Sequence, residues 1–278
     1  MGLPVALGQT PLKASLILCT YQRPDDLARC LDALSKQTVQ EFEIVQVHER
    51  GALAALRNHG ARQARTPILC FLDDDVVPAR DWLSSVLREF QDPAVMGVTG
   101  PAFISELFRQ HRDLFRYAYL KRLYDELFIP RHLRGLPGRL TPSGAFTTAA
   151  ADPFCAYYGP VEYLEACNMS FRAEAFRAVD GFDEAYQGIG DWSEPDLACR
   201  LRARYGTQCL RFTPDASVEH RPSLAGAYTL RRTVGARLDN YRLFSRRWVT
   251  PSVAHALYWG WLYAYYYAFQ PLRRCCGH

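Results

Sequence analysis

Short apolar segments alternate with amphipathic helical patterns through the first hundred residues of this 278-residue chain. Four of these segments are rich in aliphatic and β-branched residues and have the length of buried strands: 14–19, 42–47, 67–72 and 95–98. Three helical patterns lie between them, at 24–34, 52–64 and 82–90. This alternation predicts an α/β fold with a mostly parallel central sheet flanked by helices. Ligands of such sheets gather at the carboxyl ends of the strands.

The second half of the chain alternates less regularly. Its expected elements are a long aromatic and basic helix at 103–128, a loop containing Pro and Gly at 130–153, a compact apolar segment at 162–171, a helix at 173–179, a loop at 181–190, a helix from Ser193 or Glu194, and a strand at 208–212. A loop as long as 130–153 is typical of a functional segment in a compact domain.

The charge balance argues against a nucleic-acid partner. The chain has 33 Lys and Arg against 29 Asp and Glu, and the net charge of +4 is spread along the sequence. Apolar residues make up 49% of the chain, which is enough for a sizeable core. The nine cysteines include no Cys-x-x-Cys pair and several lie in apolar runs, so we expect reduced, buried thiols.

Residues 253–272 carry no formal charge unless His255 is protonated. A stretch of this length just spans a bilayer, but its many tryptophans and tyrosines favour the headgroup region. Three placements stay open: peripheral attachment to a membrane, packing against the domain, and a true span. Cys275 and Cys276 are candidates for lipid attachment. The first dozen residues show no secretion signal, so we expect a cytoplasmic protein, at the inner face of the cell membrane if the stretch attaches.

Three consecutive carboxylates, Asp73, Asp74 and Asp75, follow the third predicted strand. Their mutual repulsion is unfavourable unless a cation or hydrogen-bond donors compensate it. Because alternate strand residues face the same way, Asp73 and Asp75 should point together toward a hard divalent ion, and Asp74 elsewhere. The alternative is a turn whose aspartates cap a helix.

Several segments resemble the glycosyltransferases of family two, which have the GT-A fold. They are the opening strand and nucleotide loop at 15–24, the Arg-Asn segment at 55–60, the Asp-x-Asp region at 72–78, and acceptor-side patterns at 166–172 and 181–184. The resemblance implies a GT-A domain at 1–222, with the nucleotide and metal in 14–100 and the acceptor in 101–222. A helical, aromatic-rich extension would follow at 223–278.

The resemblance also implies donor and metal residues. Those expected beside the nucleotide sugar are Thr20, Tyr21, Arg23, Glu49, Arg57, Asp73 and Asp74. Asp75 would be the direct ligand of Mg2+ or Mn2+. Asp73 would touch the sugar portion of the donor or the same ion, and His220 would approach the diphosphate or bind the ion. The ion would neutralise the charge that grows on the departing nucleoside diphosphate. His220 ends a pattern similar to the family's Pro-Asp-Ala-x-Val-x-His, without which it would be interpreted as an ordinary polar residue.

The loop after the second strand departs from the family. The family has an Asp there that contacts the base, whereas this chain has His48 and Glu49. Three interpretations stay open: Glu49 reaches the same donor group, His48 hydrogen-bonds the base, or the segment is an ordinary surface loop.

Inversion requires a base that takes the proton of the acceptor hydroxyl as its oxygen attacks from the side opposite the diphosphate. The family carries this base in a Glu-Asp-x-Asp-Leu pattern, to which residues 193–197 are similar. That alignment places Glu194 at the position of the base, with Asp191 as the second choice. In the alternative interpretation, Glu194 and Asp196 only favour the N-terminus of a helix.

The expected acceptor-binding residues are Trp192, Asn168 and Asp196. Trp192 would bind the acceptor sugar, because an aromatic face can cover the apolar side of a sugar ring. In the alternative interpretation, Trp192 is a residue of the apolar core. Asp196 alternatively orients the loop that contains the base.

The predicted reaction moves a sugar from a nucleotide-sugar donor to a hydroxyl of a glycan or lipid-linked acceptor. A nucleotidyltransferase also uses carboxylate-bound metal, but it requires a Gly-rich phosphate loop, and residues 20–24 contain no glycine. A catalytically silent nucleotide-sugar-binding protein is the third hypothesis, and Ser193 and the altered loop after the second strand keep it open. The sequence predicts neither the sugar nor the oligomeric state.

Overall fold

The computed structural model describes residues 11–104, 118–222 and 233–269. Its strands are β1 (Ala14–Cys19), β2 (Phe42–Val47), β3 (Ile68–Asp73), β4 (Val76–Pro78), β5 (Gly97–Thr99), β6 (Ala102–Phe103), β7 (Gly159–Pro160), β8 (Asn168–Arg172), β9 (Leu210–Phe212) and β10 (Val218–His220). Its α-helices are α1 (Pro24–Ser35), α2 (Leu53–Gln63), α3 (Trp82–Glu89), α4 (Ala118–Phe128), α5 (Ala173–Ala178), α6 (Ser193–Tyr205), α8 (Val234–Trp248) and α9 (Val253–Tyr263).

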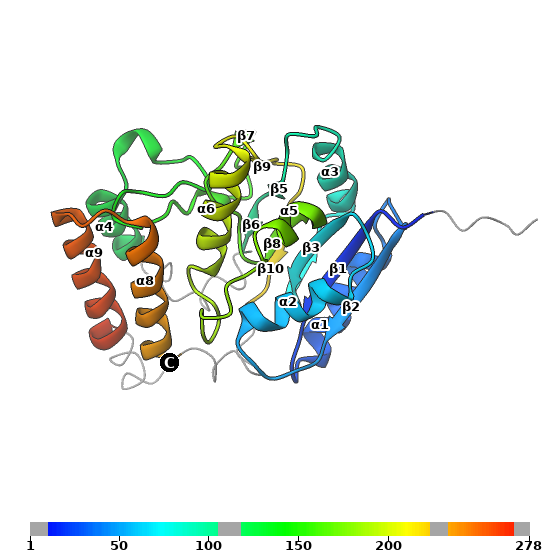
Figure 1. The fold of residues 1–278 in the computed structure, drawn as a ribbon, viewed down its shortest axis with the longest axis horizontal. Coiled ribbons are helices and arrows are strands. Elements are labelled where there is room, and N and C mark those ends of the chain that lie inside the picture. The colour runs from blue at the N-terminus through cyan, green and yellow to red at the C-terminus, as the bar shows by residue number, and fades with distance from the viewer. Residues whose placement is uncertain (1–10, 105–117, 223–232, 270–278) are drawn as a thin grey trace, which may run out of the picture.

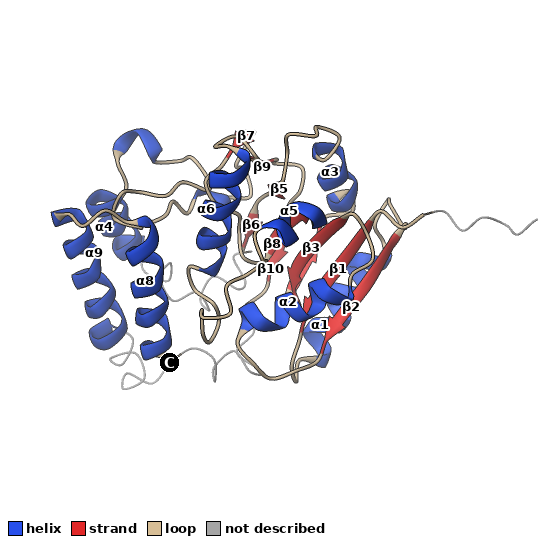
Figure 2. Cartoon of the chain, viewed as in Figure 1, coloured by secondary structure: helices blue, strands red, loops and turns tan. Residues whose placement is uncertain are grey.

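The central sheet has seven strands in the order β2-β1-β3-β8-β5-β9-β7. β1 pairs in parallel with both β2 and β3, and β5 pairs in parallel with β9. β8 runs antiparallel to both of its neighbours, and β7 runs antiparallel to β9. Five strands therefore share one direction, which confirms the expected mostly parallel sheet. Helices lie on its two sides (Figures 1 and 2).

Two apolar clusters cover the two faces of the sheet. Alternate residues of β1 belong to different clusters: Ile17 faces the one that contains α2 and α6, and Leu16 and Leu18 face the one that contains α1 and α3. The same alternation continues in β3, where Phe71 lies on the first face and Leu72 on the second. This two-sided burial explains why these strands read as continuous apolar runs instead of alternating ones.

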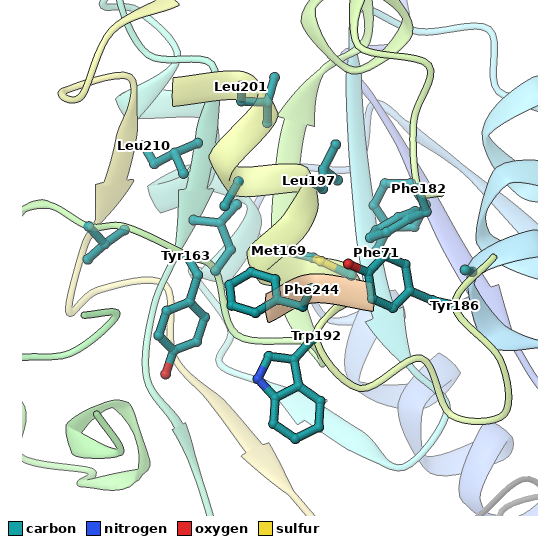
Figure 3. Close-up of a cluster of buried hydrophobic side chains, with 14 of the residues drawn as sticks. Phe71, Tyr163, Met169, Phe182, Tyr186, Trp192, Leu197, Leu201, Leu210 and Phe244 are labelled. Atoms are coloured by element: carbon teal, nitrogen blue, oxygen red, sulfur yellow. The ribbon is translucent and has the colours of Figure 1, made fainter. Parts of the chain in front are cut away.

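The C-terminal helices belong to the same apolar core as the sheet. Tyr241 and Phe244 of α8 and Tyr258 of α9 are buried in the cluster that also holds Phe71 and Trp192. Figure 3 shows Phe244 close to Trp192 in this cluster. The rings of α4 and α9 add to the packing, since the centroids of Phe128 and Tyr258 are 5.1 Å apart.

The first strands and helices match the sequence prediction closely, whereas the middle of the chain differs. Residues 102 and 103 form strand β6 instead of the start of a long helix, because β6 pairs with β10 in a small sheet of order β4-β10-β6. The helical prediction is confirmed for 118–128, is wrong for 103 and 104, and at 105–117 lies outside the described residues. The loop at 130–153 contains only two short 3-10 turns, η2 (Arg131–Leu133) and η3 (Ala149–Ala151).

Two further expectations concern the cysteines and the apolar tail. No cysteine in the described ranges forms a disulfide, and all seven are buried or half-buried. The tail at 253–272 forms α9 and a π-helical segment, η4 (Ala264–Phe269), as far as it is described. Within the described ranges, no helix has the length and apolarity needed to cross a bilayer.

Gly100 offers a test of this packing. A Cβ at position 100 would lie 2.1 Å from the carbonyl oxygen of Ala216. Because the atom that a Cβ would meet belongs to the backbone and cannot rotate away, Gly100→Ala should lower the free energy of unfolding by about 1–3 kcal/mol. The measurement is the urea midpoint of unfolding.

Gly260→Ala is the matched control, because nothing lies within 4 Å of a Cβ at that position in α9. Alanine is the better helix former, so this variant should be neutral or stabilised by up to about 1 kcal/mol. Equal midpoints for the two variants would contradict the close approach at Gly100.

Candidate active site

The three consecutive aspartates lie at the end of β3 and in the turn that leads to β4. β4 pairs with β10 in a register that sets Val76 opposite His220. This pairing brings ligand atoms of Asp73, Asp75 and His220 within 4.8 Å of one another. The Nε2 atom of His220 is 3.3 Å from Oδ1 of Asp75. Residues that are distant in sequence therefore form one cluster.

The geometry of the turn differs from the one predicted. β3 ends at Asp73, so Asp74 and Asp75 do not continue a strand, and the turn, not strand alternation, brings Asp75 back toward Asp73. Asp74 points toward Arg23, whose Nη1 lies 2.7 Å from Oδ1 of Asp74 and 3.3 Å from Oδ2 of Asp75. Thr20 also hydrogen-bonds to the Asp74 carboxylate.

Burial sets the electrostatics of this cluster. It raises the pKa of Asp74 to about 6, although Arg23 acts against the increase. It also raises the pKa of Asp73, where Arg57 opposes the shift and Asp75 adds to it. Buried carboxylates that resist ionisation are stabilised in their charged form by a nearby cation.

The donor set fits a hard divalent ion. Two carboxylate oxygens and an imidazole nitrogen lie close enough to bind one ion, and Mn2+ accepts both oxygen and imidazole ligands. Oδ2 of Asp74 is buried and has no hydrogen-bond partner among the described residues. A bound cation or a water of its coordination shell would satisfy this oxygen beside the cluster.

Arg57 of α2 joins this cluster to Glu194. Its Nη1 donates to Oε1 of Glu194 at 2.5 Å, and its Nη2 lies 3.4 Å from Oδ1 of Asp73. Nη2 also donates to the carbonyl of Ala166 at 2.8 Å, and the guanidinium lies over the ring of Phe182. Both Arg57 and Glu194 are buried. Burial raises the pKa of Glu194 above its usual range, and Arg57 partly opposes that shift.

A cavity of about 200 Å³ is lined by seven of the fourteen predicted site residues, whereas Thr20, Asp75 and His220 do not line it. Its lining comprises Cys19, Tyr21, Arg23, Leu53, Arg57, Asp73, Asp74, Ala166, Ile189, Asp191 and Glu194. Three cavities of about 540, 680 and 740 Å³ are larger, but none of them is lined by a predicted site residue. We assign the site to the smaller cavity because the carboxylates and cations converge there.

Asp191 is held by a residue that the sequence analysis missed. Nε and Nη2 of Arg237 donate to the two carboxylate oxygens of Asp191, both at 2.9 Å. Arg237 lies in α8, in the segment that the sequence analysis treated as an appended extension. No sequence motif marks it, because the pair joins residues 46 positions apart.

Not all the expected donor residues reach the cavity. Glu49 is exposed and lies 3.5 Å from Nε2 of His59, and His48 contacts Gln46. Neither lines the cavity with Asp73. The structure thus leaves the base-binding role of this loop as a prediction.

The expected acceptor residues are buried. Asn168 is 1% exposed and is held by Trp82 and two backbone carbonyls. Asp196 is fully buried and accepts from Arg200, Arg247 and Trp248. Trp192 packs on Tyr241 with a centroid distance of 5.0 Å (Figure 3 shows it within the apolar cluster). None of these three side chains lines the cavity, and their role toward the acceptor stays a prediction.

A family model described as glycosyl transferase family 2 matches residues 44–148. This match covers less than half of the chain. The matched region includes Arg57 and the three aspartates, while Glu194 and His220 lie beyond it.

Two relatives are glycosyltransferases by name. A pre-mycofactocin glycosyltransferase of Mycobacterium tuberculosis is 32% identical over 173 residues, which cover 62% of this chain and 30% of that protein. A validoxylamine A glucosyltransferase of Streptomyces hygroscopicus subsp. jinggangensis is 27% identical over 232 residues, which cover 72% of this chain and 54% of that protein. The chain thus spans about a third to a half of the length of these relatives.

Solved structures of glycosyltransferases show that this chain has the GT-A fold. The mannosyltransferase PcManGT from Pyrobaculum calidifontis, in complex with GDP-Man and Mn2+, matches with a TM-score of 0.57 and 17% identity over 97% of this chain and 77% of that one. GalNAc-T7 with UDP, GalNAc and Mn2+ matches with a TM-score of 0.57 and 12% identity over 86% of this chain and 48% of that one.

The carboxylate cluster generates a prediction about metal binding. Asp75→Asn removes one of the three ligands that lie together, so its affinity for Mn2+ should fall by roughly a hundredfold. Isothermal titration calorimetry with MnCl2 in the presence of UDP measures the change.

Asp81→Asn is the control, because Asp81 is an exposed aspartate at the start of α3. Its titration should match that of the unaltered protein. If Asp75→Asn also bound Mn2+ with unchanged affinity, the ion would not be held by this cluster.

Proposed function

We propose that this chain is a metal-dependent, inverting glycosyltransferase that moves a sugar from a nucleotide-sugar donor to a hydroxyl of a glycan or lipid-linked acceptor. The observation that supports this most strongly is the position of Arg57, which contacts Asp73 of the metal cluster and Glu194 at one cavity. The guanidinium of Arg57 thus contacts both Asp73, which would help to hold the donor, and Glu194, which would accept the proton.

The donor would bind across the carboxyl ends of β1 and β3. Asp75, Asp73 and His220 would hold Mg2+ or Mn2+, which supplies a positive charge to the departing diphosphate when it is bound. Thr20, Tyr21 and Arg23 follow β1 and would orient the nucleotide, with Asp74 fixed by Arg23. Two structures of similar fold contain Mn2+ together with a nucleotide or nucleotide sugar, which supports this arrangement.

Glu194 would act as the base. It would accept the proton of the acceptor hydroxyl while the oxygen forms its bond to the anomeric carbon and the bond to the diphosphate breaks on the opposite side. Burial makes this carboxylate a stronger proton acceptor than an ordinary Glu, and the Arg57 pair fixes its direction. Asp191 lines the same cavity and is the second candidate.

Two substitutions separate the candidates. Glu194→Gln should keep donor binding and lower kcat by about a hundredfold or more, because the amide accepts no proton at neutral pH. Asp191→Asn should lower kcat less. Because the base acts ionised and its pKa is raised, the rate of the unaltered enzyme should fall with decreasing pH at a higher pH than an ordinary Glu would give. Release of nucleoside diphosphate measures all these rates.

Glu126→Gln makes the same chemical change at an exposed position and should keep the full rate. If Glu194→Gln retained the full rate while Asp191→Asn lost it, the base would be Asp191. If no donor in a panel of UDP-, GDP- and dTDP-sugars released its nucleoside diphosphate, with or without EDTA, the silent-binding hypothesis would replace this one. Release of pyrophosphate from a nucleoside triphosphate and a sugar phosphate would indicate a nucleotidyltransferase.

We further propose that the α9 end of the molecule binds a membrane surface peripherally, where a lipid-linked acceptor would lie. Residues 253–267 contain no Asp, Glu, Lys or Arg, yet Val253 is 78% and Leu257 62% exposed. Residues 118–134 and 234–269 contain eight Lys and Arg and three Asp and Glu. Their net charge is therefore +5, whereas the net charge of the whole chain is +4. An exposed aromatic and apolar helix beside basic residues suits an anionic lipid interface.

This surface is tested by flotation with vesicles of phosphatidylcholine and phosphatidylserine. The protein should float with vesicles that contain phosphatidylserine, and the double variant Val253→Gln, Leu257→Gln should lose most of that binding. Ile44→Gln is the control, because Ile44 is exposed on β2, at the other end of the sheet. Equal flotation of all three proteins would contradict the membrane assignment.

A further inference from the structure

Helix α8 contacts the loop that leads to Glu194 at successive points. Asn240 exchanges two hydrogen bonds with the backbone of Gln187, both at 2.9 Å. Nη1 of Arg247 lies 2.6 Å from Oδ2 of Asp183. The ring of Tyr241 packs against Trp192. The loop between α5 and α6 therefore rests on α8 from Asp183 to Trp192.

The contact nearest the cavity is the pair of Arg237 and Asp191. Its two parallel hydrogen bonds of 2.9 Å fix the plane of the Asp191 carboxylate as well as its position. The side chains are only 12% and 19% exposed. The Arg237 guanidinium also lies 4.5 Å from the ring centroid of Tyr266, which is 3% exposed. An aromatic ring of the C-terminal segment thus orients the arginine.

The backbone between Asp191 and Glu194 needs such an external support. Trp192 adopts φ 65 and ψ 0, in the left-handed region that a bulky residue rarely occupies. Gly190 has φ 77, so two nearby residues share this region. A strained conformation persists only where the surrounding structure holds it. Helix α8 holds this backbone at two points: Arg237 binds the Asp191 carboxylate, and Tyr241 packs against the Trp192 ring.

We infer that Arg237 is a positioning residue of the active site, which fixes Asp191 at the cavity and, through Trp192, the start of the helix that carries Glu194. This inference rests on the proposed function, since it assigns Arg237 an effect on sugar transfer. The C-terminal segment is then part of the catalytic machinery, and Tyr266 links the aromatic tail to the cavity.

A double-mutant cycle tests the inference. Arg237→Met should lower kcat about tenfold and leave the KM for the donor nearly unchanged, because the arginine touches the base loop and not the donor residues. Asp191→Asn should have a similar effect, and the double variant should cost no more than either single change. Arg237→Lys should restore part of the rate. If the two losses multiplied, or if Arg237→Met kept the full kcat, the inference would be wrong.

Hydrogen exchange provides a readout that needs no turnover. Amides of residues 186–194, such as that of Ser193 bonded to Gly190, should exchange roughly tenfold faster in Arg237→Met than in the unaltered protein. Arg242→Gln is the control, because Arg242 lies in the same helix and pairs with the exposed Asp239. Unchanged exchange in Arg237→Met would overturn the positioning role.

The two readouts fail separately. If Arg237→Met exchanged faster but the unaltered protein transferred no sugar, the proposed function would be wrong and the support of Asp191 by Arg237 would still hold. Normal transfer by the unaltered protein, with no effect of Arg237→Met on either exchange or kcat, would sink the positioning role and leave the proposed function intact.

Discussion

One buried guanidinium joins the two halves of the candidate active site. Arg57 lies in α2 on the nucleotide side, and it contacts Asp73, Glu194 and the carbonyl of Ala166. Removing this cation would leave the buried carboxylate of Glu194 and the half-buried carboxylate of Asp73 without its charge, which is more unfavourable than replacing the whole group of charges by apolar residues. The position of Glu194 relative to the carboxylate cluster is therefore fixed by an interaction between residues 137 positions apart.

The acids at the end of β3 depend on compensation in the same way. Arg23, Thr20 and His220 contact Asp74 and Asp75; Thr20 and Arg23 lie in the segment between β1 and α1, and His220 ends β10. Burial still raises the pKa of Asp74 to about 6 despite Arg23. The carboxylates of Asp73 and Asp75 and the imidazole of His220 could together hold a divalent ion, whose charge would favour their ionised form.

The C-terminal helices α8 and α9 are packed into the domain, and α8 contacts a residue of the candidate site. They share the apolar core of the sheet, and α8 holds the loop from Asp183 to Trp192 through polar and aromatic contacts. One face of α9 packs on α4 while the other exposes Val253 and Leu257. The same segment therefore connects a solvent-exposed apolar surface to the cavity by way of Tyr266 and Arg237.

The sequence by itself determined the sheet, most of its helices and the composition of the site. Period and composition are local properties, so β1, β2 and α1 matched their predicted ranges, and the resemblance of short motifs brought together Arg57, Asp73 and Glu194. Only the tertiary structure decided that Asp75 returns through a turn, that Asn168 and Asp196 are buried, and that Arg237 holds Asp191. These features depend on contacts between distant segments, which no local pattern records because each partner alone is an ordinary polar residue.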